Sequence, residues 1–174
     1  GVMYVPSVTV PWLAGLESDG KAGYRRGREA SLYLDGPQGL PLMKPPYGRI
    51  TAIDLNTGNH LWMVPNGDGP RDHPALKGLK LPQLGQPGRA APLLTRSFLF
   101  MGEGDMVGIS MPKFSGGNMF RAYDKKTGKV VWQADLGAGT TSPPISYMYK
   151  GKQYIVVGVG GVNHPAELVA MRVE

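Results

Sequence analysis

The most constraining feature of this sequence is a short segment that occurs twice. Residues 51–62 read TAIDLNTGNHLW, and residues 121–132 read RAYDKKTGKVVW. Each copy has an Ala, an Asp two positions later, Thr-Gly three positions after the Asp, and a Trp four positions after the Gly. A fixed sequence period indicates a repeat architecture in which each unit packs against its neighbours.

The repeat lies in a chain that is rich in short β-strand patterns. Helical periodicity is nearly absent, because Gly or Pro interrupts the windows in which it would appear. The 174 residues include 26 Gly and 16 Pro, which favours many turns. An all-β fold is therefore predicted. Apolar segments bounded by turn residues predict strands at 2–10, 30–34, 49–55, 60–64, 91–95, 97–102, 119–124, 130–136, 144–150, 153–159 and 167–173.

These strands group into a unit of four, here called strands A to D. Four short antiparallel strands repeated in tandem are typical of a β-propeller blade, and a propeller needs typically 4 to 8 blades to close. We therefore expect a partial β-propeller of two to three blades, taken from the C-terminal end of a longer one. The expected parts are a partial blade at 1–67, an inserted loop at 68–88, a full blade at 89–137 and a partial closing blade at 138–174. In the partial first blade only strands C and D are well defined, at 49–55 and 60–64.

The net charge of +6 is most concentrated in KAGYRRGRE, residues 21–29. Basic residues beside an aromatic ring are typical of nucleic-acid surfaces, but this cluster is short and matches no nucleic-acid-binding module. We expect Arg25, Arg26 and Arg28 to lie in a solvated loop, and we expect no nucleic-acid partner. The chain has no Cys, which excludes disulfides and thiolate metal sites. No apolar run approaches the ~20 residues that span a bilayer, and any export signal would lie outside this sequence.

A Trp at the same place in each copy predicts a repeated structural role. Its indole is a rigid plate that buries roughly 150–250 Å² when enclosed. We expect Trp62 and Trp132 to pack between neighbouring blades, with the Thr-Gly turn aiming each ring and the motif Ala leaving room beside it. The alternative for either ring is stacking on a cofactor.

The pattern A-x-D-x-x-T-G-x-x-x-W resembles the tryptophan-docking motif of the dehydrogenases that depend on pyrroloquinoline quinone (PQQ), the quinoproteins. Further stretches at 45–69, 116–136, 140–161 and 164–171 resemble the glucose-dehydrogenase-like branch of that family. The resemblance covers most of residues 37–174, is weaker over 1–36, and implies an eight-bladed propeller. The matching motif residues are Ala52, Asp54, Thr57, Gly58 and Trp62, and again Ala122, Asp124, Thr127, Gly128 and Trp132.

The resemblance also implies a cofactor and a reaction. PQQ would lie over the propeller axis with a calcium ion and oxidise an alcohol or the anomeric carbon of a sugar. An acidic residue would act as general base, and electrons would pass to a quinone or a cytochrome. Calcium prefers several oxygen ligands at once, and no dense Asp, Glu and Asn cluster occurs here. The base is therefore unassigned, no metal ligand is assigned in this chain, and we expect the calcium ligands in other blades.

Gly160, Gly161 and His164 carry the one cofactor contact that the resemblance implies. In the glucose-dehydrogenase-like branch a Gly-Gly and then a His lie near the quinone, and GVGGVNH at 158–164 is similar. Two residues between the Gly pair and the His depart from the family pattern. Gly lets the backbone approach a flat ring closely, and imidazole titrates near neutrality. The alternative is a Gly-rich turn with an ordinary surface His.

Four further titratable residues have plainer interpretations, which we favour. His73 could line an entrance from the 68–88 loop, but an ordinary loop His is favoured. His60 lies on a strand and is expected at a half-exposed position. Glu103 and Asp105, in the segment GEGD, could act as a base or bind a metal, but a solvated turn is favoured.

The resemblance and the repeats together predict part of a periplasmic quinoprotein dehydrogenase, soluble or membrane-anchored, that oxidises a sugar or alcohol. Its partners would be the substrate, a quinone or cytochrome acceptor, and the remaining blades of the parent chain. The rival from another class is a non-catalytic propeller that acts as a protein-binding scaffold. The 158–164 stretch and the long 68–88 loop favour the enzyme, because a scaffold needs neither.

Overall fold

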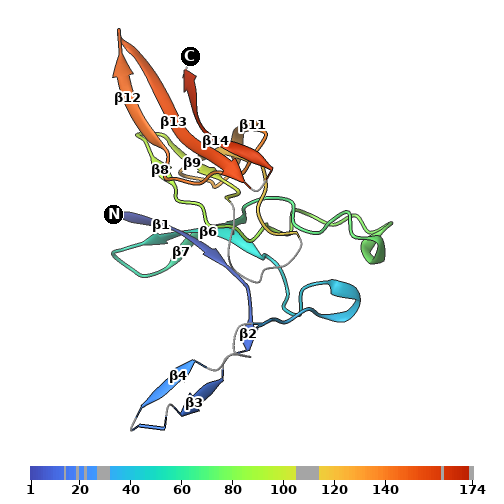
Figure 1. The fold of residues 1–174 in the computed structure, drawn as a ribbon. Coiled ribbons are helices and arrows are strands. Elements are labelled where there is room, and N and C mark those ends of the chain that lie inside the picture. Colours follow the sequence, from blue (N-terminus) through green and yellow to red (C-terminus); the bar gives the residue numbers. More distant parts are fainter. Residues whose placement is uncertain are drawn as a thin grey trace.

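The computed structural model describes residues 1–13, 15–18, 20–21, 23–26, 32–104, 114–161 and 163–172. Within these residues the regular structure is antiparallel β-sheet, with two single-turn 3-10 helices. Figure 1 shows three sheets stacked above one another and a thin arm below them. This arrangement confirms the all-β prediction. No helix in the described part of the chain is long and apolar enough to cross a membrane.

The middle sheet is the complete four-stranded blade that the repeat predicts. Its strand order is β11-β10-β9-β8, so strand A (β8) and strand D (β11) lie at its two edges. The strands are β8 (Leu93–Leu94), β9 (Phe98–Gly102), β10 (Met119–Asp124) and β11 (Val130–Asp135). β8 is shorter than the predicted segment 91–95, because Pro92 lacks the N–H that a longer ladder would need.

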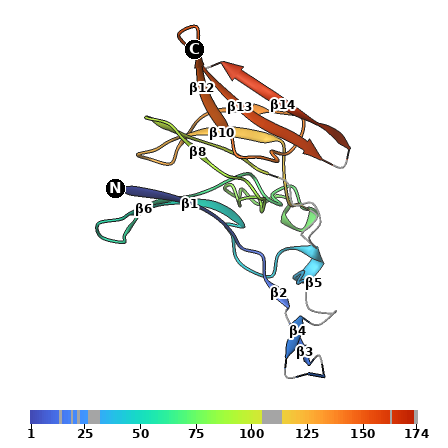
Figure 2. The same ribbon diagram turned by 60° about the vertical axis from the view of Figure 1, so that its left-hand side comes forward.

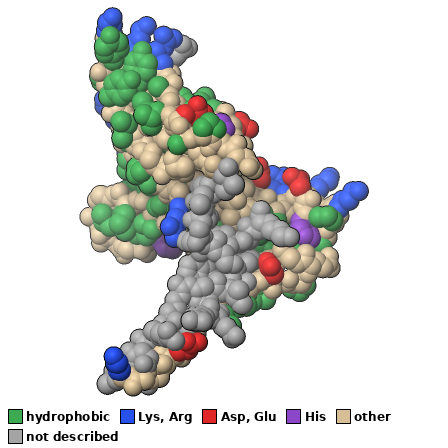
Figure 3. Space-filling model, in the orientation of Figure 1, with side chains coloured by type: hydrophobic (Ala, Val, Ile, Leu, Met, Phe, Trp, Pro, Cys, Tyr) green, Lys and Arg blue, Asp and Glu red, His purple; other side chains and the backbone are tan. Residues whose placement is uncertain are grey.

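The upper sheet supplies strands A, B and C of the next blade. Its order is β12-β13-β14, with β12 (Ile145–Tyr149), β13 (Lys152–Gly161) and β14 (His164–Arg172). β13 and β14 extend beyond the predicted segments because Gly161 pairs directly with His164 across the connection. Hydrophobic side chains gather over the β12 end of this sheet (Figure 3). The exposed apolar residues there include Ile145, Tyr147, Met148 and Tyr149.

The lower sheet contains one more strand than the sequence defines for the first blade. Its order is β1-β6-β7, with β1 (Val2–Val8), β6 (Gly48–Asp54) and β7 (His60–Pro65). β1 therefore takes the place of strand B. Between β1 and β6 lies the arm seen in Figures 1 and 2. Its elements are β2 (Trp12–Leu13) paired with β5 (Leu32–Tyr33), β3 (Leu16–Ser18) paired with β4 (Tyr24–Arg26), and the 3-10 turn η1 (Pro37–Gly39).

The long connection from β7 to β8 folds back onto the lower sheet. Its two ends are joined by backbone hydrogen bonds from Leu84 N to Asp68 O at 3.0 Å and from Gln86 N to Asn66 O at 2.7 Å. A 3-10 turn, η2 (Pro74–Leu76), lies between these ends. Gly85 has φ +76° and contacts the backbone of Gly48 so closely that a Cβ would collide with it.

Two apolar clusters hold the three sheets together. Side chains alternate between the faces of a strand, so β9 and β10 contribute to both clusters. Between the lower and middle sheets the buried residues are Ile50, Leu99, Met101 and Tyr123. Between the middle and upper sheets they are Phe100, Phe120, Ala122, Ala138, Ile155, Val157 and Val159. The middle sheet is therefore apolar on both faces, as a blade between two neighbours must be.

Trp62 packs between blades as predicted, and its partner is the Thr-Gly turn of the following blade. Its Nε1 donates a hydrogen bond to Lys125 O at 3.0 Å, and Tyr4 Oη donates to the same carbonyl at 3.2 Å. A Cβ on Gly128 would lie 2.8 Å from the Trp62 ring. The Ala expected beside the ring is Ala52, the cross-strand partner of Trp62. The glycine of one repeat thus makes room for the indole of the repeat before it.

Trp132 occupies the same strand position in a different setting. It is paired with Ala122 across the sheet, as Trp62 is with Ala52. Its ring meets Phe120 edge-on, with centroids 6.4 Å apart, and 42% of its surface is exposed. It lines a groove of about 540 Å³ that also contacts Ile155 and Met171 of the upper sheet. The two indoles are therefore equivalent in register but not in burial.

The Asp of the motif shapes the turn that receives Trp62. Asp124 Oδ1 accepts hydrogen bonds from Thr127 N and Thr127 Oγ1, both at 2.9 Å, and from Lys126 N at 3.0 Å. The hydroxyl of Thr127 contributes most to holding the pKa of Asp124 below its ordinary value. Gly128 follows with φ +70°, a conformation that glycine adopts without steric cost. The A-x-D-x-x-T-G pattern is therefore the sequence of a capped turn.

Candidate functional site

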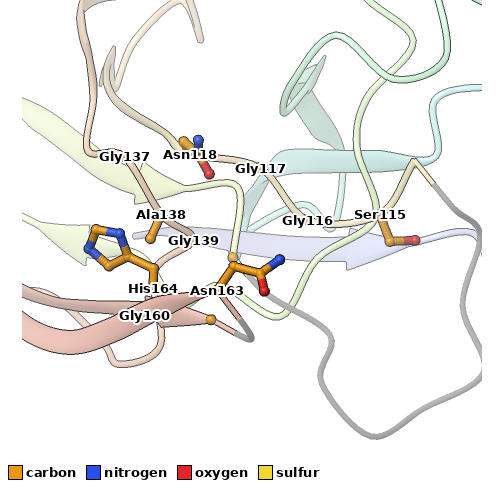
Figure 4. Close-up of a pocket in the computed structure, with 12 residues that line it drawn as sticks. Ser115, Gly116, Gly117, Asn118, Gly137, Ala138, Gly139, Gly160, Asn163 and His164 are labelled. Atoms are coloured by element: carbon orange, nitrogen blue, oxygen red, sulfur yellow. The ribbon is translucent and has the colours of Figure 1, made fainter.

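A pocket of about 270 Å³ opens where three interstrand connections meet (Figure 4). They are the β9–β10, β11–β12 and β13–β14 connections, which all leave the same end of the middle and upper sheets. The pocket brings together all three predicted cofactor-contact residues, Gly160, Gly161 and His164. The lining residues are Gly104, 115–118, 137–139, 160–161 and 163–164.

Most of the lining residues are glycines. At some of these positions the neighbouring atoms are so close that a side chain would not fit. A Cβ on Gly117 would collide with the carboxylate of Glu103. A Cβ on Gly160 would lie 3.3 Å from Ala166 Cα. The resulting surface is largely backbone, which lets a flat molecule approach closely.

His164 is the titratable side chain of this lining. It begins β14, and its Nε2 lies 2.8 Å from Glu167 Oε1, three residues along the same strand. The His164 side chain is 31% exposed and Gly137 lies beside its Cε1. The carboxylate fixes the direction of the imidazole ring, so His164 is an oriented group at the pocket rim.

A buried hydroxyl without a partner also lies in the lining. Ser115 Oγ has no hydrogen-bond partner among the described residues, although the atom is shielded from solvent. Buried hydroxyls in proteins almost always have a partner. The wall of the pocket therefore contains an unpaired hydroxyl whose oxygen is not exposed to solvent.

Glu103 contradicts the sequence expectation of a solvated turn. It is 5% exposed, and its Oε1 accepts a hydrogen bond from Arg121 Nη1 at 2.7 Å. Both side chains of this ion pair are almost completely buried, at 6% and 2% exposed. The reason is tertiary, because Gly67 and Gly88 of the β7–β8 connection and Gly117 pack directly against Glu103. Asp105, the other carboxylate of GEGD, lies outside the described residues.

A second buried polar contact joins the lower and middle sheets beside this ion pair. Tyr123 Oη donates to Asn66 Oδ1 at 2.8 Å, and Asn66 Nδ2 donates to Gly102 O at 2.9 Å. Burial is the main cause that raises the pKa of Tyr123 to about 12. Tyr123 thus stays protonated and acts as a hydrogen-bond donor.

The remaining sequence candidates lie away from the pocket lining. His73 caps the η2 turn by accepting a hydrogen bond from Ala75 N at its Nδ1, which is an ordinary loop role. His60 is exposed at the start of β7, rather than half-exposed. Arg25 and Arg26 lie in strand β4 instead of a loop, and Arg28 lies outside the described residues. In the described part of the chain no group of three or more His, Cys, Asp and Glu side chains could hold a metal ion.

Comparisons with known proteins agree with the repeat and the fold. The family model described as PQQ: Glucose/ethanol/alcohol dehydrogenase, beta-propeller domain matches residues 14–155. The chain is 37% identical over 129 residues to the quinate/shikimate dehydrogenase (quinone) of Acinetobacter baylyi, covering 72% of this chain and 15% of that protein. It is also 37% identical over 128 residues to the quinoprotein glucose dehydrogenase of Gluconobacter oxydans, covering 71% of this chain and 14% of that protein.

A solved structure supports the fold alone. The quinohemoprotein alcohol dehydrogenase from Comamonas testosteroni superposes with a TM-score of 0.56 and 23% identity, covering 92% of this chain and 20% of that one. The chain thus spans about a fifth or less of the length of each of these proteins.

Proposed function

The chain belongs to the β-propeller family of PQQ-dependent dehydrogenases, and from this premise we propose that it forms blades of a longer quinoprotein that oxidises a sugar or an alcohol. The relatives named above support the substrate class, and their greater length supports a longer parent. The uncovered apolar surface of the upper sheet supports further blades as neighbours, because patches of this kind mark contact surfaces. We place the protein in the periplasm, with a quinone or cytochrome as electron acceptor.

The observation that carries the proposal is the pocket that contains Gly160, Gly161 and His164. PQQ is a flat ring system with polar edges, and the pocket offers a glycine-rich surface that is largely backbone, together with an oriented imidazole. The residues that line the pocket are therefore suited to contact one part of a PQQ molecule. Bound PQQ would supply the hydride acceptor of the reaction.

The roles of this chain's residues follow from their contacts. Gly160 and Gly161 have no side chains that would project into the pocket, so a ring can lie against their backbone. His164, held by Glu167, can donate or accept a hydrogen bond at the rim. We assign the general base and any calcium ligands to the other blades of the longer protein.

The test uses the complete protein that carries this chain, incubated with PQQ and Ca²⁺. Cofactor absorbance is followed in a titration, and dye reduction is followed with glucose, glycerol, quinate and ethanol. We expect His164→Ala to weaken PQQ binding about tenfold, or about 1.4 kcal/mol. His73→Ala is the matched control, because it removes a loop imidazole outside the pocket and should leave binding unchanged. No cofactor absorbance and no turnover in the unsubstituted protein would refute the proposal in favour of the protein-binding scaffold.

A further inference from the structure

The buried ion pair between Glu103 and Arg121 has no role in the function proposed so far. Taking two charges out of water costs free energy, which their attraction offsets only when the geometry is good and the remaining polar atoms are paired. Here the Oε1–Nη1 distance is 2.7 Å, and Arg121 Nε also donates to Gln133 Oε1 at 3.3 Å. Glu103 is also the only acidic residue among the buried polar residues of the described chain. Because burial of the two charges is costly, we ask what Glu103 contributes to the fold around it.

Glu103 lies directly behind one wall of the glycine pocket. That wall, which we call the lip, consists of residues 115–118. Glu103 Oε2 accepts a hydrogen bond from Met119 N at 3.3 Å, immediately after the lip. Within the lip, Gly117 rests on the carboxylate so closely that a Cβ would collide with it, although its own φ is not in the left-handed region. The glycine is therefore required by the contact with Glu103, not by the backbone.

Other contacts of the lip are hydrogen bonds between neutral groups, and one of them, from Leu136 N to Asn118 O at 3.0 Å, comes from the end of β11. Gly117 N donates to Gly104 O at 3.2 Å, and Gly116 N donates to Pro87 O at 2.8 Å. Gln86 Nε2 donates to Gly116 O. The Glu103 carboxylate adds a charged group to these contacts, because it packs directly against Gly117 and accepts the Met119 N–H at 3.3 Å immediately after the lip. Arg121 Nη1 holds the other oxygen of that carboxylate at 2.7 Å.

We propose that Glu103 is a positioning residue for the pocket: its carboxylate, neutralised by Arg121, holds the lip at the place where it lines the site. The inference rests on the proposed function only for the identity of the ligand, which we take to be PQQ. It does not make Glu103 a base or a metal ligand, because the side chain is enclosed behind the lip and is already paired.

The first experiment separates positioning from general stability. In the complete protein, Glu103→Gln should weaken PQQ binding about tenfold, or about 1.4 kcal/mol. Asp68→Asn is the matched control, because it removes the carboxylate of another Asp/Glu–Arg ion pair. That pair, with Arg71, is 2.8 Å long, exposed, and lies in the β7–β8 connection. Asp68→Asn should leave PQQ affinity unchanged.

The decisive variant is the double substitution Glu103→Leu with Arg121→Met. Replacing a buried ion pair by apolar residues of similar volume is often neutral or stabilising, so the thermal midpoint should recover relative to Glu103→Gln. The lip still lacks its anchor in this variant, and PQQ affinity should remain about tenfold reduced. If affinity recovers together with stability, Glu103 has a purely structural role and the proposal is wrong.

Hydrogen exchange measures the lip without any ligand. We expect backbone amides at 115–119 to exchange about tenfold faster in both Glu103 variants, while those at 153–157 in β13 keep their wild-type rates. Unchanged exchange at 115–119 would overturn the positioning role. If the unsubstituted protein does not bind PQQ at all, the proposed function fails, and the exchange rates still decide whether Glu103 positions the lip.

Discussion

Removal of each motif indole provides a direct test of how the blades are held together. We expect Trp62→Ala to destabilise the 174-residue chain much more than Trp132→Ala, although both rings occupy the same position in the repeat. Trp62 is enclosed by the turn of the next blade and hydrogen-bonded to Lys125 O. Trp132 is 42% exposed, and its ring meets Phe120 of its own blade edge-on.

The magnitudes follow from burial. Truncating a buried Trp or Phe to Ala costs about 3–5 kcal/mol. The Trp62 ring is partly exposed, so the lower end, about 3 kcal/mol, applies, of which about 1 kcal/mol is the lost hydrogen bond. For Trp132 the removed contact area is smaller and no hydrogen bond to its indole is seen in the described structure, so about 1 kcal/mol is expected.

The assay is urea unfolding followed by far-UV circular dichroism, because each substitution removes one of the three Trp fluorophores and so changes the emission signal itself. The free energy of unfolding is obtained by linear extrapolation for the wild type and both variants. Trp62→Phe supplies an intermediate case, which keeps the apolar ring and loses the N–H, and should cost about 1 kcal/mol. Equal losses for the two Ala variants, or a larger loss at Trp132, would refute the interblade docking of Trp62.

Two further predictions concern the turn that receives this ring. Gly128→Ala should destabilise the chain by about 1–2 kcal/mol from its positive φ alone, and by more because the new Cβ would collide with Trp62. Gly58 also has a positive φ, +74°, but open space around it, so Gly58→Ala should cost only the backbone contribution. Thermal unfolding of the two variants compares these costs. The Thr127 hydroxyl is the main cause that lowers the pKa of Asp124. The ionised Asp124 carboxylate therefore stabilises the folded chain fully above the ordinary carboxyl pKa of 3.8, and this stabilisation is lost as pH falls through the lowered pKa. Asp124→Asn should flatten that acid limb in a plot of thermal midpoint against pH, and an unchanged limb would show that the turn contributes nothing.

The pocket itself could be predicted only in part. Gly160, Gly161 and His164 could be identified from a resemblance, because they follow a strand in a recognisable local pattern. Ser115 and the lip carried no such signal, since nothing local shows which connections of neighbouring blades converge. Glu103 was assigned to the wrong environment for the same reason. Its sequence neighbours are those of a surface turn, and the residues that enclose it are Arg121 of β10, Gly117 of the lip, and Gly67 and Gly88 of the β7–β8 connection.

The sequence by itself determined the elements that depend on local and periodic signals. Apolar segments bounded by turn residues placed the strands of the middle and upper sheets, and the spacing of Ala, Asp, Thr-Gly and Trp identified the repeat and its turn. Tertiary structure alone decided the pairings between distant segments. β1 joins β6 across the whole arm, Trp62 docks on Gly128 rather than on its own turn, and Glu103 pairs with Arg121 under the lip. Each of these depends on which segments pack together in space, and that information lies in the packed sheets and not in any single stretch of the chain.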